Sequence, residues 1–279
     1  MSKARKGTHA ETARALGAIP ELGPTAGLHT LGAHLRAASG EAHARQLMAM
    51  LPEALAVTAA EAPFRTRPYA LGTDSSRRGS DVDSIWARTL WKDLGPHGAG
   101  EMRAFGCPRL IGIRVEVADR RRVGRWEHID LLGIDVHNRL PVVIEMKGTR
   151  SPSSPLAALV DAVAYGLALK KAWPHRLRAD WARAVNGAGF GEPRLPVFLD
   201  RLTVIVAAPD SYWRARHEGN SLTQRRMSTA ALQTVHAFVD ALRYQGFDAQ
   251  FASLSERKVG GRVCGLEAMY HSLPRLGTC

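Results

Sequence analysis

The segment HIDLLGIDVHNRLPVVIEMKG, residues 128–148, decides the fold, because it predicts two strands joined by a tight turn. Apolar and β-branched residues dominate 127–136 and 140–146, and the polar residues 137–139 separate these two runs. A break of this length between strand-like runs favours a β-hairpin. We therefore expect the two strands to pair about residues 137–139.

Three charged residues interrupt this apolar hairpin, namely Asp130, Glu145 and Lys147. Side chains alternate between the two faces of a strand, so Glu145 and Lys147 project from the same face. Pairing about the turn places the start of the first strand beside the end of the second, which brings Asp130 next to both. Two carboxylates and one ammonium group then converge, and burying such charges without partners is costly.

A divalent metal would resolve this conflict. Carboxylate oxygens from Asp130 and Glu145 suit Mg²⁺, which keeps several waters and accepts few protein ligands. Lys147 would stand beside a metal-bound water or a phosphate oxygen as a compact positive charge, an arrangement that suits phosphodiester cleavage. The alternative is a structural ion pair on a half-exposed strand, since a Glu-x-Lys pattern is common by chance.

The order of Asp130, an apolar strand, a short turn and a strand ending in Glu145-Met146-Lys147 resembles the core of the PD-(D/E)XK nuclease superfamily. The resemblance extends from a helix near residue 80 to a strand near residue 250. It implies an α/β fold with a restriction-endonuclease-like αβββαβ core, a central mixed sheet flanked by helices. It also implies that Asp130 and Glu145 bind the metal with the Met146 carbonyl, and that Lys147 assists the attacking water.

The next helix of the superfamily often carries a Q-x-x-x-Y motif. Here the corresponding segment runs from Asp161 to Tyr165, so the Tyr is present and Asp replaces the Gln. Residues four apart on the helix expected over 155–173 share one face. If that face lies over the hairpin, Tyr165 is a catalytic residue that orients Lys147 or a phosphate. Otherwise Asp161 is a surface residue and Tyr165 belongs to the core.

Three further polar residues near the hairpin are less favoured candidates for the site. His128 shares its strand face with Asp130, so it contacts a phosphate, orders Asp130 or packs as a strand histidine. Glu116, on the strand expected over 109–119, is a less favoured metal ligand. Asp135 has the opposite parity to Asp130, so we do not expect it to bind the metal.

The chain divides by composition into four parts, predicted as a peripheral basic segment at 1–26, an Ala-rich helical region and linker at 27–79, the nuclease-like domain at 80–256 and a peripheral tail at 257–279. Breaks at Gly40 and Pro52 predict two or three short helices in the second part. We expect its histidines, among them His29 and His34, to be surface residues and not metal ligands.

The second half of the nuclease-like domain follows a strand–helix–strand pattern. Strands are expected over 201–208 and 247–254, with an amphipathic helix over 228–245 between them. A further helix is expected over 81–94, at the start of the same domain. Several glycines and prolines predict an irregular segment over 174–200.

Lys and Arg number 38 against 26 Asp and Glu, which gives a formal charge of +12. This excess favours a polyanionic partner, DNA or alternatively RNA, although a GC-rich codon bias also enriches Arg and Ala. Basic stretches at 63–80, 120–125 and 209–227 could contact phosphates, and Tyr212 and Trp213 could stack on bases.

Three cysteines without zinc-like spacing favour a reducing compartment, and no apolar run approaches the length of a membrane span. We therefore expect a cytoplasmic protein without a membrane partner. The sequence leaves its oligomeric state open.

These observations lead to one favoured function and two alternatives. The favoured one is a deoxyribonuclease, expected to be an endonuclease, that uses Mg²⁺ or in its place Mn²⁺. The first alternative is a non-catalytic DNA-binding protein on the same fold. The second is a protein-interaction module that docks a partner through its N-terminal helices.

Overall fold

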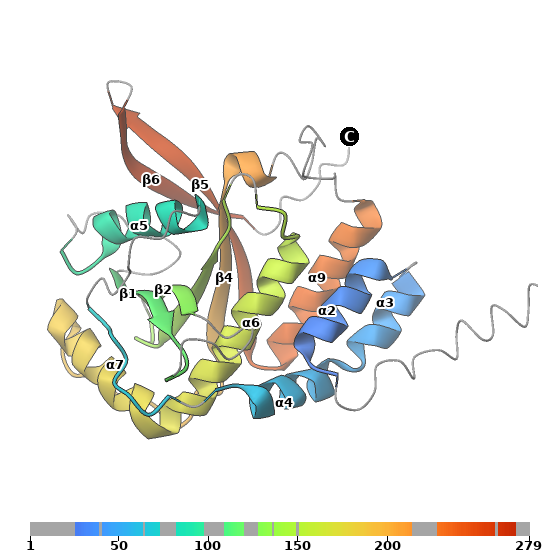
Figure 1. Cartoon of the computed structure of the whole chain (residues 1–279), viewed down its shortest axis with the longest axis horizontal. Helices are drawn as coiled ribbons and strands as arrows, with labels where there is room; N and C mark the ends of the chain where they lie inside the picture. Colours follow the sequence, from blue (N-terminus) through green and yellow to red (C-terminus); the bar gives the residue numbers. More distant parts are fainter. Residues whose placement is uncertain are drawn as a thin grey trace, which may run out of the picture.

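The computed structural model describes residues 26–38, 41–63, 65–72, 82–97, 109–119, 128–135, 137–148, 151–213, 228–259 and 262–271. These residues form a mixed sheet with helices on both faces (Figure 1). The strands are β1 (Arg109–Glu116), β2 (His128–Ile134), β3 (Pro141–Met146), β4 (Leu202–Pro209), β5 (Phe247–Val259) and β6 (Arg262–His271). The helices are α2 (Leu28–Ala37), α3 (Glu41–Met48), α4 (Leu51–Glu61), α5 (Val82–Leu94), α6 (Pro155–Ala172), η2 (Trp173–Leu177), α7 (Arg178–Val185), η3 (Asn186–Phe190) and α9 (Thr229–Tyr244).

The strands lie side by side in chain order. The ladders β1–β2, β2–β3 and β5–β6 are antiparallel, whereas β3–β4 and β4–β5 are parallel. Parallel neighbours need a crossover connection, which α6 provides between β3 and β4 and α9 provides between β4 and β5. The prediction of a mixed sheet flanked by helices is therefore confirmed.

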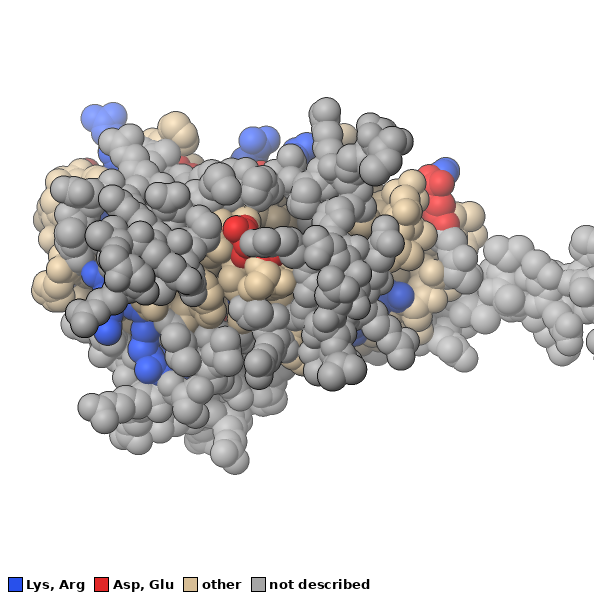
Figure 2. Space-filling model, turned by 90° about the horizontal axis from the view of Figure 1, so that it is seen from above, with Lys and Arg blue, Asp and Glu red and all other residues tan. Residues whose placement is uncertain are grey.

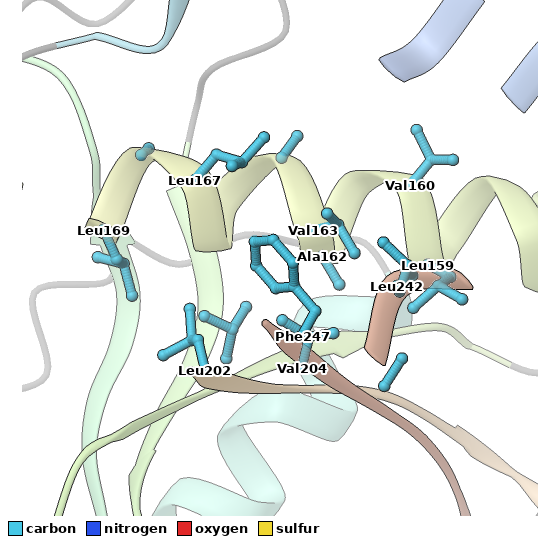
Figure 3. Close-up of a cluster of buried hydrophobic side chains, with 14 of the residues drawn as sticks. Leu159, Val160, Ala162, Val163, Leu167, Leu169, Leu202, Val204, Leu242 and Phe247 are labelled. Carbon is cyan, nitrogen blue, oxygen red and sulfur yellow. The ribbon is translucent and has the colours of Figure 1, made fainter. Parts of the chain in front are cut away.

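The central strands are buried on both faces, and all six residues of β3 are buried. One hydrophobic core lies between the sheet and α6, and it includes residues of α2, α4 and α9. A second core lies between the opposite face and α5. Figure 3 shows α6 above β4 and β5, where Val163 lies over Phe247 and Leu159 lies near Leu242 of α9.

Helices α2 and α4 pack directly on α6, whereas α3 packs on α9 and α2 (Figure 1). The Thr58 hydroxyl of α4 accepts the backbone N–H of Leu28 at 2.7 Å, which satisfies a free donor at the start of α2. Lys171 of α6 donates through Nζ to the carbonyls of Ala60 and Ala62 at 2.9 and 2.6 Å. These contacts fix α2 and α4 relative to α6, the helix that follows Glu145 and Lys147 in the chain.

Residues 174–190 are helical, so the prediction of an irregular segment over 174–200 is wrong for this part. Trp173, Leu177, Trp181 and Val185 are spaced by four residues and are all fully buried. This apolar face outweighs the breaking tendency of Pro174, and α6 continues directly into the π-helical turn η2 with Ala172 and Trp173 in helical backbone conformation.

Residues 257–259 and 262–271, predicted as part of a peripheral tail, instead complete β5 and form β6. Val259 pairs with Arg262, so only the two glycines at 260 and 261 separate the strands. Two adjacent glycines between strand-like runs are a hairpin signal, which outweighs the reading of these glycines as breaks in a peripheral tail. None of the helices in the described residues is long and apolar enough to cross a membrane.

Candidate active site

The predicted hairpin is present, and its charged residues lie where β2 and β3 diverge. The β2–β3 ladder runs from Ile134–Pro141 to Leu131–Ile144 and ends there. Beyond that point β2 stays paired with β1, and β3 stays paired with β4 through Glu145 and Met146. The two strands therefore form a fork, and the site is built on the residues next to it.

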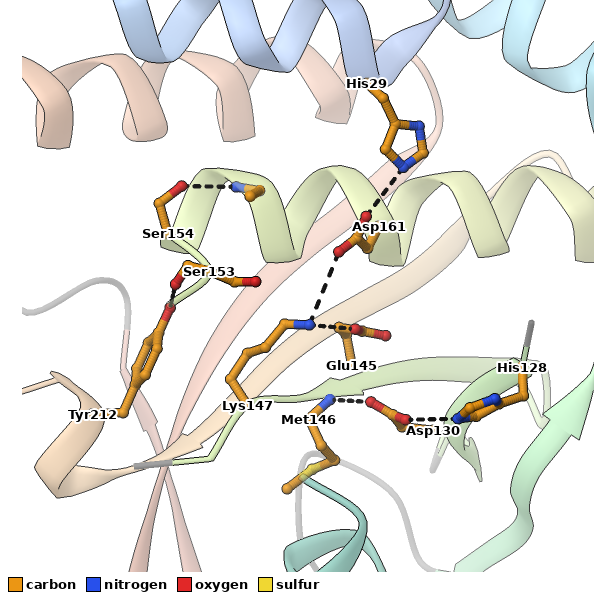
Figure 4. Close-up of polar contacts among 11 residues, drawn as sticks. His29, His128, Asp130, Glu145, Met146, Lys147, Ser153, Ser154, Asp161 and Tyr212 are labelled. Carbon is orange, nitrogen blue, oxygen red and sulfur yellow. Dashed lines mark hydrogen bonds and ion pairs between the residues drawn. The ribbon is translucent and has the colours of Figure 1, made fainter. Parts of the chain in front are cut away.

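Asp130 lies on the β2 side of the fork and is fixed by the opposite strand. Its Oδ2 accepts the backbone N–H of Met146 at 2.9 Å, as Figure 4 shows. The carboxylate thus takes the place of the strand carbonyl that this amide lacks. His128 Nε2 lies 3.5 Å from Asp130 Oδ1, so His128 has the Asp-ordering role that was one of its predicted alternatives. Both side chains are largely buried.

Glu145 and Lys147 lie on the β3 side and project from the same face, as the strand alternation predicted. The Nζ of Lys147 is 2.7 Å from Glu145 Oε1, and the two side chains are 8 and 9% exposed. The backbone N–H of Lys147 donates to the Ala207 carbonyl at 2.9 Å, so β4 holds this residue just past the end of β3. The pair is therefore placed by the sheet and not by a free loop.

The electrostatics of the pair reflect its burial. Burial raises the pKa of Glu145 well above its usual range, repulsion from Asp130 adds to this rise, and the Lys147 ammonium opposes it. Burial lowers the pKa of Lys147, but the Glu145 carboxylate outweighs burial, so the net shift is upward. Lys147 is charged at neutral pH.

Asp161 on α6 joins the site from above the sheet. Its Oδ2 is 3.9 Å from Lys147 Nζ, and its Oδ1 is 3.1 Å from Nε2 of His29 (Figure 4). Asp161 thus faces the hairpin, in agreement with one of its two predicted positions. His29 was predicted to be a surface residue, but it is half-buried against Asp161, and no local sequence signal marks it.

Tyr165 lies one turn after Asp161 and packs partly buried against the main core. Its predicted catalytic role stays a prediction, as does the role of the Met146 carbonyl. The Met146 side chain is fully buried in the second core, and its amide is used by Asp130. Asp135 lies in the turn, where its carboxylate accepts the amides of His137 and Asn138, so it is away from the fork as expected.

Several residues predicted for nucleic-acid contact have structural roles instead. Tyr212 is fully buried and donates to the Ser153 carbonyl at 2.7 Å, which anchors the connection before α6. Trp213 donates to the carbonyls of Ala208 and Ala252. Arg65 is buried and bonds to Glu116, so this acid is paired within the fold. The basic stretches 120–125 and 214–227, and Arg77 and Arg78, lie outside the described residues.

The donor set suits a cation that needs few protein ligands. Three carboxyl groups, from Asp130, Glu145 and Asp161, act on the Lys147 ammonium, and those of Asp130 and Glu145 are largely buried. No group of three His, Cys, Asp or Glu side chains in the described residues is arranged to hold a metal. Asp130 and Glu145 would therefore supply two carboxylates and water the remainder, as Mg²⁺ accepts.

Figure 2 looks down on the molecule from the top of Figure 1 and shows acidic atoms near the middle of this face. Basic atoms are visible on both sides and along the upper edge of the same view. Comparison of the chain with protein-family models, curated proteins and solved structures finds no match. The function is therefore inferred from the geometry of the site.

Proposed function

We propose that this chain is a divalent-metal-dependent nuclease that hydrolyses phosphodiester bonds in DNA. The observation that carries the proposal is the fork between β2 and β3. It brings Asp130 of β2 together with Glu145 and Lys147 at the end of β3, so that two carboxyl groups and one ammonium group lie close together. A divalent cation would take two carboxylate ligands from Asp130 and Glu145, and water and a bound phosphodiester would supply the remaining oxygen ligands.

Each residue has a distinct part in the proposed chemistry. Asp130 and Glu145 would hold the cation, which when bound supplies a Lewis acid for the phosphate and an acidified water. Asp130 is kept in orientation by the Met146 amide and His128, so its geometry does not depend on the substrate. Lys147 presents an ammonium next to this place, where it can orient the attacking water or bind a phosphate oxygen.

The net charge supports a nucleic-acid substrate. A formal charge of +12 attracts a polyanion, and phosphate contacts supply most of the affinity of proteins for DNA. We infer that cleavage is internal, with Mg²⁺ or Mn²⁺ as the metal.

Cleavage of supercoiled plasmid and of linear DNA in Mg²⁺, Mn²⁺ or EDTA tests the proposal. The wild type is expected to nick the plasmid only with metal, and Asp130→Asn, Glu145→Gln or Lys147→Met should each lower the rate by about 100-fold or more. Asp135→Asn is the matched control, because it alters an acid of the same hairpin that lies in the turn. Equal loss in the control, or full activity of Lys147→Met, would contradict the assignment.

A second candidate is a DNA-binding protein without turnover. The close Lys147–Glu145 pair favours it, because Glu145 is already neutralised by a partner within the protein. This candidate predicts DNA retention that weakens steeply with salt, without cleavage in any metal. If the protein digests linear DNA but leaves the supercoiled plasmid intact, it is an exonuclease and not an endonuclease.

A further inference from the structure

A continuous chain of polar contacts leads from the N-terminal helix α2 to the proposed site (Figure 4). His29 Nε2 lies 3.1 Å from Asp161 Oδ1, Asp161 Oδ2 lies 3.9 Å from Lys147 Nζ, and Lys147 Nζ lies 2.7 Å from Glu145 Oε1. The two oxygens of Asp161 therefore face different partners. One is directed to α2 and the other to the lysine.

The approach of α2 to α6 depends on Gly32. A Cβ atom at position 32 would lie 2.7 Å from Cγ2 of Val160, closer than side chains tolerate. Val160 is next to Asp161, and His29 is one turn before Gly32, so this close contact brings His29 within reach of Asp161. The Leu28 amide bonds to Thr58, which anchors the same turn of α2 to α4.

Asp161 is the second carboxylate available to Lys147. The first is Glu145, which the proposed function also assigns to the cation, so the cation and the ammonium share one carboxylate. Asp161 offers the ammonium an alternative partner on α6, and among the residues that the structure describes Asp130 is the third carboxylate that acts on Lys147. His29 binds the far oxygen of Asp161 and so restricts the rotation that would turn the carboxylate away.

We propose that His29 and Asp161 are positioning residues that orient Lys147 for phosphodiester hydrolysis, which makes helix α2 part of the active site. This inference rests on the proposed nuclease function and adds to it a requirement for the N-terminal helices. The competing explanation is a purely structural contact that fastens α2 to α6.

The test compares His29→Leu with His29→Gln and with His34→Leu, in the full chain. Leu removes the hydrogen bond to Asp161, whereas the Gln amide can donate in place of Nε2. His34 lies on the same helix and is also half-buried, so His34→Leu controls for loss of a histidine. We expect His29→Leu to lower kcat by about 10-fold with unchanged KM, because misplacement of a catalytic group costs rate and not ground-state binding. His29→Gln should restore most of the rate, and His34→Leu should keep it.

A second readout does not depend on activity. The Nζ resonance of Lys147, observed by ¹⁵N NMR without metal or DNA, should move in His29→Leu and in Asp161→Asn and stay in place in His34→Leu. An unchanged Nζ resonance in His29→Leu, or an equal loss of rate in both leucine variants, would overturn the positioning role. If the wild type cleaves no DNA, the nuclease proposal fails, and an Nζ resonance that still responds to His29 shows separately that the contact chain exists.

Discussion

The Nζ of Lys147 lies 2.7 Å from Glu145 Oε1, and both side chains are more than nine-tenths buried. A buried ion pair offsets its desolvation only while both partners are present. Lys147→Met leaves a buried carboxylate without its cation, so the free energy of unfolding should fall by about 3 kcal/mol. The double variant Lys147→Met/Glu145→Gln should recover much of this loss in urea unfolding. A double variant as unstable as the sum of the single variants would mean that the pair is not coupled.

Gly32 should tolerate alanine poorly, although alanine favours helices. The new Cβ would lie 2.7 Å from Val160 Cγ2, so α2 must move away from α6. Overpacking of this kind costs about 1–3 kcal/mol, more than the gain of up to about 1 kcal/mol in helix propensity. Gly187→Ala is the control, because its Cβ would meet open space in another helix. Thermal unfolding should show Gly32→Ala less stable than the wild type and Gly187→Ala at least as stable.

Gly246 combines a positive φ with a close backbone contact. Its φ is +76°, and a Cβ there would lie 2.2 Å from the Asp200 carbonyl oxygen. Gly246→Ala should therefore lower the free energy of unfolding by more than the ~1 kcal/mol expected for a left-handed conformation alone. Gly72→Ala isolates that smaller cost, since Gly72 has φ +80° and open space around it. Equal losses for the two variants would show that the turn at 246 relaxes without cost.

Asp119 should stabilise the fold in a pH-dependent way. Three hydrogen bonds to its carboxylate lower the pKa of Asp119 from 3.8 to about 2. The Thr66 hydroxyl makes the largest contribution, and the backbone amides of Thr66 and Arg67 add to it. Because the folded pKa is below the unfolded one, the stabilisation is present above about pH 4 and is lost as the pH falls towards 2. Asp119→Asn should therefore be less stable than the wild type at pH 6, and the two should converge near pH 2. A difference in urea midpoint that stays constant from pH 6 to pH 2 would contradict this.

The hairpin and its charged residues could be predicted from the sequence, because strand alternation and a short turn are local signals. Glu145, Lys147 and Asp130 follow from these rules alone. His29 could not be found in this way. Its place near Asp161 depends on the contact between Gly32 and Val160, two residues far apart in the chain whose proximity arises only when α2 packs on α6.

The mistaken predictions for the second half of the chain have local causes. Pro174 and several glycines suggested an irregular segment, whereas the four-residue spacing from Trp173 to Val185 determines its helices. Tyr212 appeared beside many arginines and was predicted to stack on bases. Burial against the core and a hydrogen bond to Ser153 instead make it an anchor for the connection to α6. Composition indicates a partner only when the side chains concerned are on the surface.

Binding of Mn²⁺ to the DNA-free protein, followed by the loss of the electron paramagnetic resonance signal of the free ion, tests the central claim most directly. We expect one bound ion per chain in the wild type and in Asp135→Asn, and strongly weakened binding in Asp130→Asn and Glu145→Gln. Binding that is equal in all four proteins, or absent from the wild type, would contradict a metal site at the fork between β2 and β3.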